Sequence, residues 1–312
     1  MILKNLSYII TTKNKINYLP IVINNLTKNI QPDEEIVVVD ANSSDGTKEY
    51  LISLYNNGII QKFISEPDHA QAHGCNKALL MAEGKLLKII NDDDMFYYEG
   101  IRKCKKFMLE NPEFDLIGMD GAGADFRNNN LSYFPSYPEY INSYNKWKTE
   151  KTPFSFCDLG LMIRKSSLSY LGLFNPAYIR LDAEFTFRAS SLPKTKIAWY
   201  TGCCYVRIAN ENSNSVKYGE FMDVEWEKLE WIYLKSNERY KTKKSIIQKL
   251  KEKIKRKIFL IGEKYKNKKL NIDNSNNMNN IEETQISWEE FCNKTDIWLK
   301  KNNSENSGKF YI

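Results

Sequence analysis

Apolar and polar positions follow two periods along the first 120 residues of the chain. Short β-branched runs predict buried strands, and the stretches between them, where apolar residues recur every three or four positions, predict amphipathic helices. The predicted strands cover residues 6–12, 35–40, 60–66, 85–90 and 114–120. The predicted helices cover residues 17–30, 45–57, 70–84 and 97–111. This alternation predicts an α/β fold with a mostly parallel sheet flanked by helices.

The pattern is looser between residues 121 and 165, which are rich in Asn, Ser, Tyr and Pro. We interpret this region as a substrate-facing insertion. The elements predicted after it are a strand and a short helix within 156–172, a helix that starts near 182, a strand over 196–208, an aromatic helix over 218–235 and a last short helix over 287–301. Before that last helix, the Asn-rich residues 271–284 predict a flexible linker.

Composition excludes several classes of protein. No apolar run reaches the roughly 18–20 residues of a membrane-spanning helix. The first residues lack the apolar core and cleavage site of a signal peptide, so we expect a cytoplasmic protein. The six cysteines are scattered without a C-x-x-C pair, which predicts free thiols. His69 and His73 are the only histidines, which disfavours a His-rich metal site or a His-dependent triad.

The net charge of +6 is concentrated in one segment of the chain. Residues 241–269 contain thirteen Lys or Arg and two Glu. Apolar residues recur there at helical spacing, at Ile247, Leu250, Ile254, Ile258 and Ile261. Such a basic amphipathic helix lies on an anionic membrane or docks its apolar stripe on the rest of the chain, and the sequence leaves both open. It lacks interleaved aromatic residues and a recognisable module, so we expect no nucleic-acid binding.

Polar clusters follow each of the first four predicted strands. They are TTKN (11–14), DANSSDGT (40–47), SEPDHAQAHG (65–74) and NDDDM (91–95). In an open parallel sheet, ligands bind at the carboxyl ends of the strands. We therefore expect the four clusters to line one rim of the sheet.

The last of these clusters places three carboxylates, Asp92, Asp93 and Asp94, directly after a buried strand. Adjacent carboxylates repel one another and lose hydration there, unless a divalent cation lies among them. Mg²⁺ and Mn²⁺ prefer oxygen ligands, and Mg²⁺ is usually held by one or two carboxylates and substrate phosphates. A solvated acidic turn is the alternative interpretation, but the position at the end of the fourth strand favours a Mn²⁺ or Mg²⁺ site.

Asp40 ends the second predicted strand and has two potential roles. Its carboxylate can accept hydrogen bonds from a nucleoside ring or ribose, or it can cap the following turn. The sequence contains neither a P-loop motif nor a first-turn G-x-G-x-x-G motif. A P-loop NTPase or a dinucleotide dehydrogenase is therefore not expected.

Four segments in this order resemble the family 2 glycosyltransferases with a GT-A fold. They are SYIITTKNKINYLP, IVVVDANSSDGTKEYL, SEPDHAQAHGCNKALLMAEGKLLKIINDDD and LGLFNPAYIRLDAEFTFRAS, within roughly residues 5–215. The resemblance implies a GT-A-like (Rossmann-like) catalytic domain over 1–216, with a nucleotide-binding half to about 118 and an acceptor-binding half from 119. A helical basic extension (217–270) follows, and then an Asn-rich linker with a short C-terminal helix (271–312).

The resemblance also implies roles for individual residues of the nucleotide-binding half. Thr11 and Asp40 would contact the nucleoside. Asp68 and Lys77 would help to hold the nucleotide and its phosphates. NDDD (91–94) stands where the family has a DxD-like motif. Asp92 and Asp93 would then face the ribose and the donor sugar, and Asp94, together with Asp92, would bind the metal.

The catalytic base is implied by a second stretch, LDAEF (181–185). The resemblance places the base at Asp182. Glu184 stands where the family usually has another Asp and is the alternative base. Arg188 fits an arginine that often follows on the same helix. Arg207 is the candidate for a basic residue near the diphosphate, where a guanidinium can form paired hydrogen bonds, and a surface salt bridge is its alternative role.

Together these residues imply an inverting transfer of a sugar. Asp182 would take the proton from an acceptor hydroxyl that attacks the anomeric carbon, while the metal and Arg207 stabilise the departing nucleoside diphosphate. The implied donor is a nucleotide sugar, by default a UDP-sugar, in hexosyl or N-acetylhexosaminyl transfer. The implied acceptor is a glycan or lipid-linked saccharide in bacterial surface polysaccharide synthesis. Residues 241–269 would then bring the enzyme to the inner face of the plasma membrane.

Two other hypotheses remain open from the sequence. A metal-dependent nucleotidyltransferase also uses carboxylates and a metal, but it usually has a Gly-rich, Lys-bearing loop after the first strand, and TTKNKINYLP contains no Gly. A non-catalytic sugar-nucleotide-binding scaffold is the second. The presence of Asp40, Asp94 and Asp182 argues against a degenerate site.

Overall fold

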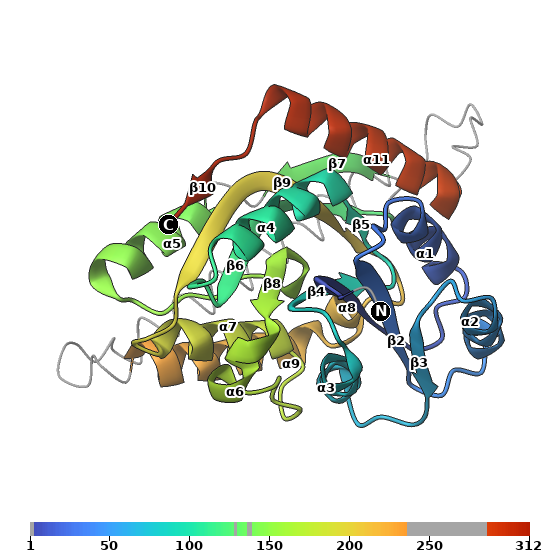
Figure 1. The fold of residues 1–312 in the computed structure, drawn as a ribbon, viewed down its shortest axis with the longest axis horizontal. Coiled ribbons are helices and arrows are strands. Elements are labelled where there is room, and N and C mark those ends of the chain that lie inside the picture. Colours follow the sequence, from blue (N-terminus) through green and yellow to red (C-terminus); the bar gives the residue numbers. More distant parts are fainter. Residues whose placement is uncertain (1–2, 128–129, 136–138, 236–285) are drawn as a thin grey trace, which may run out of the picture. The chain divides into compact units, whose positions relative to one another are not determined.

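The computed structural model describes residues 3–127, 130–135, 139–235 and 286–312. Ten strands of these residues form one sheet in the order β10-β9-β6-β8-β4-β1-β2-β3, with β5 paired to β9 and β7 to β6 (Figure 1). The strands are β1 (Leu6–Thr12), β2 (Glu34–Asp40), β3 (Lys62–Ser65), β4 (Leu86–Asn91), β5 (Met95–Phe96), β6 (Leu116–Asp125), β7 (Asn130–Pro135), β8 (Leu161–Arg164), β9 (Ile197–Ala209) and β10 (Phe310–Tyr311).

Helices connect these strands and cover the sheet. The α-helices are α1 (Leu19–Thr27), α2 (Thr47–Asn56), α3 (Gln71–Met81), α4 (Tyr98–Glu110), α5 (Glu139–Glu150), α6 (Leu168–Leu171), α7 (Leu181–Ser191), α8 (Asn214–Lys217), α9 (Gly219–Glu230) and α11 (Trp288–Glu305). Three short helical segments complete the described elements: η1 (Asp158–Gly160), η2 (Lys165–Ser167) and η3 (Trp231–Lys235). The fold class predicted from the sequence is confirmed.

The first four predicted strands form a parallel half-sheet, in the order β4-β1-β2-β3. Each parallel pair needs a long crossover, which α1, α2 and α3 supply. The register pairs Thr12 with Asp40, and Thr11 with Asn91. The carboxyl ends of β1, β2 and β4 therefore meet at the same edge of the sheet.

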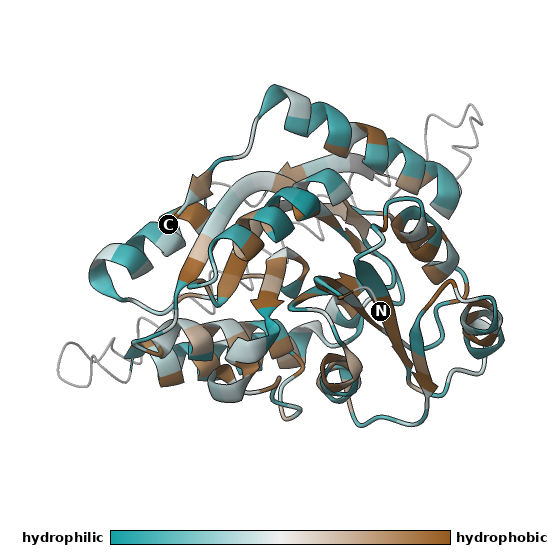
Figure 2. Ribbon diagram, viewed as in Figure 1, coloured by the Kyte–Doolittle hydropathy of each residue, from teal (hydrophilic) through white to brown (hydrophobic). Residues whose placement is uncertain are grey.

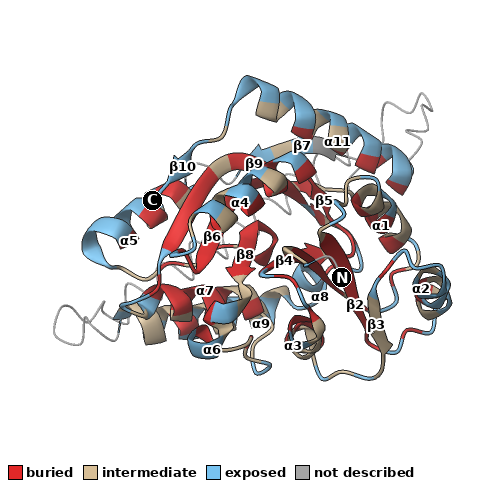
Figure 3. Ribbon diagram, viewed as in Figure 1, coloured by how far each residue is buried: buried red, intermediate tan, exposed pale blue. Residues whose placement is uncertain are grey.

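Alternate residues of the central strands enter two apolar layers. Tyr8 and Ile10 pack with residues of α1, α2 and α4, whereas Ile9 packs with residues of α3, α5 and α7. Because successive side chains of a strand point to opposite faces, these helices cover the two faces of the sheet. Figures 2 and 3 show the result: the strands are largely apolar and buried, and the helices expose polar residues on their outer sides.

The second half of the sheet is mixed in direction. β8 lies antiparallel between β4 and β6, and β6 pairs in parallel with β9. The interpretation of 121–165 as an irregular insertion is wrong for much of its length, because the region contains the end of β6, β7, α5 and β8. Buried Ile141, Tyr144 and Trp147 recur three residues apart in α5, and Trp147 Nε1 donates to the Ser190 carbonyl at 2.9 Å.

Residues 286–312 return to the sheet. β10 pairs antiparallel with β9, and α11 packs Phe291 and Leu299 into an apolar cluster with residues of β5 and β9. The helix begins after Ser287, whose side chain accepts a hydrogen bond from the Glu290 amide at 3.1 Å, as in a capping box. The described residues of 3–234 and 286–312 form one compact unit. The domain boundaries expected at 216 and 271 remain predictions.

Two predictions lie outside the described residues: the basic amphipathic helix within 241–269 and the linker at 271–284. They remain predictions. Among the helices that the structure describes, none is long and apolar enough to cross a membrane.

Candidate active site

A cleft of about 820 Å³ lies at the carboxyl ends of the parallel strands. Its lining includes the loops after β1, β3 and β4, which carry three of the four polar clusters found in the sequence. The cluster after β2 contributes Ala41 only. All four clusters follow strands that end at one edge of the sheet, as predicted, but only three of them contribute several residues to the cleft. We call this cavity the donor cleft.

The ammonium group of Lys15 lies close to both Asp92 and Asp93 in the donor cleft. Lys15, in the loop after β1, forms an ion pair with Asp93, and its Nζ lies 3.8 Å from Asp92 Oδ1. Asn210 Nδ2 donates to Asp93 Oδ2 at 2.8 Å. Burial disfavours the charge of Lys15, but the two carboxylates outweigh this effect and raise the pKa of its ammonium group.

Asp94 is buried and is held by its immediate surroundings. Its Oδ1 accepts from the Ile208 amide at 2.6 Å, and its Oδ2 accepts from Asn91 Nδ2 at 3.2 Å. Burial and the charge of Asp93 raise the pKa of Asp94 well above its usual range. The same two effects raise the pKa of Asp92 to about 7. These carboxylates therefore resist ionisation in the cation-free protein.

The side chains of Asp92, Asp93 and Asp94 offer the kind of ligand atom that the predicted cation prefers. These three consecutive carboxylates line the cleft, and in the part of the chain that the structure describes only Lys15 forms ion pairs with them. Oxygen ligands with an excess of negative charge are what Mg²⁺ and Mn²⁺ prefer. Among the described residues, however, the ligand atoms that converge within 4.8 Å are those of Cys157, Asp158 and Asp182 and not those of the triplet. A cation held by Asp92 and Asp94 therefore remains a prediction.

Thr11 and Asp68 line the donor cleft, as predicted. Behind them lies Gly74 of α3, where a Cβ would be 3.0 Å from Asp68 Oδ2 and 3.2 Å from Thr11 Cγ2. A larger residue at this position would push on both side chains. Burial raises the pKa of Asp68, and the positive charges of Lys13 and Lys77 oppose the shift.

Asp40 and Lys77 lie outside the lining of the cleft. Asp40 is fully buried and accepts from the Ser43 amide at 3.0 Å and from Ser65 Oγ at 2.6 Å. Lys77 Nζ pairs with Glu66 Oε1 at 2.7 Å. The structure thus gives Asp40 the turn-capping contacts of its alternative role. The nucleotide contacts of both residues remain predictions.

A second cavity of about 900 Å³ adjoins the donor cleft. Much of its lining is aromatic: Phe134, Tyr140, Phe154, Phe156, Phe187, Tyr205 and Trp226. Four residues line both cavities: Cys157, Asp182, Arg207 and Ser215. Two charged side chains, Asp182 and Arg207, therefore lie where the cavities meet. We call the second cavity the aromatic cavity.

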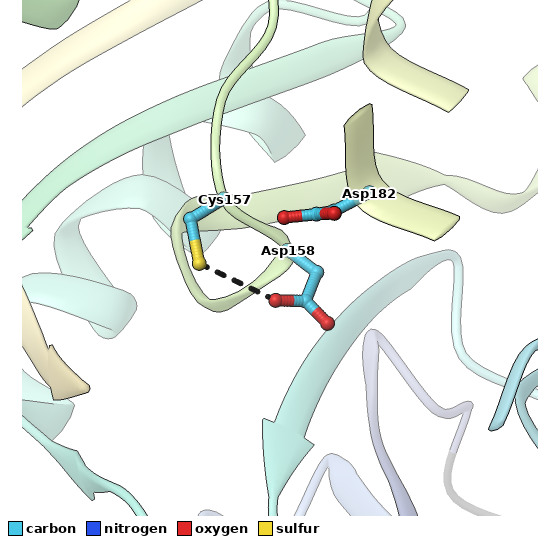
Figure 4. Close-up of side chains that lie close together, drawn as sticks. All are labelled: Cys157, Asp158 and Asp182. Atoms are coloured by element: carbon cyan, nitrogen blue, oxygen red, sulfur yellow. Dashed lines mark hydrogen bonds between the residues drawn. The ribbon is translucent and has the colours of Figure 1, made fainter. Parts of the chain in front are cut away.

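Asp182 stands in the first turn of α7, beside Cys157 and Asp158 (Figure 4). The potential ligand atoms of these three residues lie within 4.8 Å of one another. Cys157 Sγ donates to Asp158 Oδ1 at 3.4 Å, and burial raises the pKa of the thiol well above its usual range. Mg²⁺ and Mn²⁺ prefer oxygen ligands to sulfur, so the thiol makes this trio less suited to these two cations than a set of carboxylates.

The same surroundings suit Asp182 and Asp158 to proton transfer. Burial raises the pKa of Asp182. Burial and the charge of Asp182 raise the pKa of Asp158 to about 6. Carboxylates with raised pKa values in a cleft are typical of groups that accept protons near neutral pH.

Glu184, the alternative base, lies outside the lining of both cavities. Its carboxylate forms a two-point ion pair with Arg188, with distances of 2.8 and 3.1 Å, and accepts from the Tyr233 hydroxyl at 3.3 Å. Arg188 also donates to the carbonyls of Leu171 and Leu173. This buried network fixes α7 in the core. Asp182 thus lies where the two cavities meet and Glu184 does not, and the role of base remains a prediction for both.

Sequence reasoning missed four polar residues of the site: Lys15, Cys157, Asp158 and Asn210. Lys15 lies one residue beyond the TTKN cluster, and its basic charge next to a strand end was a usable signal. Asp158 is a carboxylate within an otherwise apolar stretch, FCDLGLMI, which is also a detectable signal. The position of Asn210 depends on the pairing of β9 with β5, which the local sequence does not reveal.

Comparisons with known proteins agree with this architecture. The model of the family "Glycosyl transferase family 2" matches residues 7–171, more than half of the chain. The structure of S. aureus TarS 1-349 in complex with UDP-GlcNAc has a TM-score of 0.52 and 18% identity, over 76% of this chain and 76% of that chain. A comparison with curated proteins finds no match.

Two further solved structures are similar. Mannosyltransferase PcManGT from Pyrobaculum calidifontis, in complex with GDP-Man and Mn²⁺, has a TM-score of 0.55 and 17% identity, over 77% of this chain and 66% of that chain. A longer S. aureus TarS structure has a TM-score of 0.51 and 18% identity over 75% of this chain. The chain spans 44% of that TarS chain.

The fold is that of the GT-A glycosyltransferases. The chain belongs to glycosyl transferase family 2, as the resemblance in its sequence predicted. Membership of this family supports a glycosyltransferase that uses a nucleotide-sugar donor. Asp182 and Arg207 lie beyond the matched residues 7–171, so their roles depend on the geometry of the two cavities.

Proposed function

We propose that this protein is an inverting glycosyltransferase that depends on Mn²⁺ or Mg²⁺ and transfers a sugar from a nucleoside diphosphate sugar to an acceptor hydroxyl. One observation carries the proposal: Asp182 and Arg207 line both cavities, and one of these cavities also holds the Asp92–Asp94 triplet. A group-transfer enzyme needs such a junction, because donor and acceptor must meet at the catalytic groups.

In this proposal the donor occupies the donor cleft. Asp94 and Asp92 hold the cation, which when bound neutralises the charge of the paired phosphates. Arg207 reaches the junction without donating a hydrogen bond to the residues that the structure describes, so its guanidinium is available to the departing phosphates. The neighbouring structures hold UDP-GlcNAc in one case and GDP-Man with Mn²⁺ in the other. UDP-sugars are our first choice of donor, with hexosyl or N-acetylhexosaminyl transfer.

The acceptor occupies the aromatic cavity, with its hydroxyl at the junction. Asp182 accepts the proton of this hydroxyl as the oxygen attacks the anomeric carbon. A single displacement inverts the anomeric configuration. The aromatic lining suits the apolar faces of sugar rings, and we propose a glycan or lipid-linked saccharide in bacterial surface polysaccharide synthesis. The basic residues 241–269 would then hold the protein at the inner face of the plasma membrane.

A thermal-shift screen of nucleotide sugars, with Mn²⁺ or with EDTA, tests the donor half of the proposal. A ligand that binds the folded state raises the unfolding temperature as its concentration rises. We expect such a rise for one nucleotide sugar in Mn²⁺ and its loss in EDTA. Nucleotide release in the presence of candidate acceptors then tests transfer. Binding without any nucleotide release would indicate the non-catalytic scaffold instead.

A further inference from the structure

Helix α9 borders both cavities, although it lies beyond residues 7–171. Its Met222 lines the donor cleft, and its Asp223 and Trp226 line the aromatic cavity. Leu229, also on α9, is fully buried in an apolar cluster with Ala183 and other residues of α7. The helix that carries Asp182 is therefore packed directly against α9.

The contact between the two helices is anchored by Glu225 of α9. Its carboxylate accepts from the Ile179 amide at 3.0 Å and from the Arg180 amide at 2.9 Å. Arg180 is the N-cap residue of α7, and its own side chain makes no capping hydrogen bond. The first turn of a helix leaves amides unpaired and carries partial positive charge, so a carboxylate from another helix is favourable there. Glu225 fixes the backbone two and three residues before Asp182.

Arg180 makes the reciprocal contacts. Its Nε donates to the Met222 carbonyl at 2.6 Å, and its Nη2 lies 3.6 Å from Asp223 Oδ1. The guanidinium also lies over the ring of Trp226, 5.5 Å from the centroid. Backbone and side chain of the same residue are thus both tied to α9. A shift of α7 at this end would break all of these contacts together.

We propose that Glu225 is a positioning residue for Asp182. It holds the start of α7 so that the Asp182 carboxylate stays at the junction of the two cavities. This inference rests on the proposed function, since it takes Asp182 as the base. Misplacement of a reacting group by about 1 Å is enough to cost on the order of 100-fold in rate. A residue that touches neither substrate can therefore control turnover.

Two substitutions of Glu225 and one matched control test this role. Glu225→Ala removes both acceptors, whereas Glu225→Gln keeps one amide oxygen and the shape of the side chain. Glu227→Gln is the control, because Glu227 is exposed on the same helix and lines neither cavity. We expect kcat to fall roughly 10- to 100-fold in Glu225→Ala, less in Glu225→Gln, and not at all in the control. The donor KM should change less than kcat, because Ile179 and Met222 form only one wall of the donor cleft and the Asp92–Asp94 triplet does not contact Glu225.

Hydrogen exchange measured by mass spectrometry gives a readout that needs no activity. The peptide containing Ile179 to Asp182 should exchange faster in Glu225→Ala and at the wild-type rate in Glu227→Gln. Faster exchange with a fall in kcat that exceeds any change in the donor KM supports the positioning role. Faster exchange with unchanged kcat in both Glu225 variants overturns it, as does a loss of donor binding equal to the loss of kcat. A wild-type protein without transferase activity refutes the proposed function instead, while the exchange rates still test the contact.

Discussion

The donor cleft and the aromatic cavity share Asp182 and Arg207 but are built in different ways. The donor cleft owes its chemistry to the loops after neighbouring parallel strands, where short stretches of sequence bring carboxylates and Lys15 together. The aromatic cavity takes its lining from β6, α5, α7, β9 and α9, which are far apart along the chain. The donor cleft holds consecutive carboxylates beside Lys15, which suits a cation and phosphates, whereas the second cavity adds seven aromatic residues to its charged ones, which suits sugar rings.

This difference assigns binding and catalysis to separable groups of residues. A substitution in the Asp92–Asp94 triplet should affect the donor and leave the aromatic cavity intact. A substitution of the proposed base, Asp182, should affect transfer and leave donor binding intact. If both kinds of substitution change donor binding and kcat to the same extent, binding and catalysis are not assigned to separate groups of residues.

The largest effect is expected for Asp182→Asn. The amide cannot accept the proton of the acceptor hydroxyl, and a positioned base contributes about 10²–10⁴ in rate, so we expect kcat to fall about 10³-fold. The thermal shift produced by the donor with Mn²⁺ should persist. Transfer assays and thermal unfolding of the same preparation check both points. Normal turnover in this variant would move the role of base to Glu184 or Asp158.

Asp94→Ala is expected to weaken binding of the nucleotide-sugar donor. Loss of a ligand should weaken the cation-dependent binding of the nucleotide sugar by about 100-fold, since changes to metal ligands or their partners typically cost 10–100-fold. Titration of the donor at several Mn²⁺ concentrations measures this change. Glu227→Gln is again a suitable control. Unchanged donor binding in Asp94→Ala, with Mn²⁺ still required, would place the cation elsewhere.

The same contrast explains how far the sequence alone could lead. The carboxylates of the donor cleft follow strands whose apolar runs are readable locally, so the Asp92–Asp94 triplet was placed at the correct edge of the sheet. Asp40 ends such a strand too, yet its carboxylate is occupied by serine hydroxyl and amide groups, and no local pattern distinguishes these two outcomes. The lining of the aromatic cavity includes residues of α5 and α9, and the positions of these helices depend on tertiary packing that the local sequence does not reveal. The contact of Glu225 with the amides of Ile179 and Arg180 could not be predicted from the sequence for the same reason.

Arg207→Lys is expected to have a moderate effect on both sides of the junction. Lysine keeps the positive charge but loses the planar pair of donors that suits phosphate oxygens. We expect kcat/KM to fall roughly 10-fold, which corresponds to about 1.4 kcal/mol. The melting temperature of the free protein should not change, because the guanidinium donates no hydrogen bond to the described residues. A surface salt-bridge role predicts the opposite: normal kinetics and a small loss of stability.

The smallest expected effect is a change with pH in the free energy of unfolding of the metal-free protein. Burial and the charge of Asp93 raise the pKa of Asp92 to about 7 in the folded protein, above the usual value in the unfolded chain. Between about pH 4 and 7 the folded state therefore binds a proton that the unfolded state has lost, so the free energy of unfolding falls as pH rises through this window. We expect a loss on the order of 1 kcal/mol, or roughly 2–4 °C in melting temperature.

Thermal unfolding of the wild type and Asp92→Asn across this window isolates that contribution. The variant cannot ionise at residue 92, so its melting temperature should fall less between pH 5 and 7.5 than that of the wild type, both measured in EDTA. Mn²⁺ should reduce the difference at pH 7.5, because a bound cation stabilises the ionised carboxylate. Parallel pH curves for the two proteins in EDTA would mean that the carboxylate of Asp92 is already ionised without a cation.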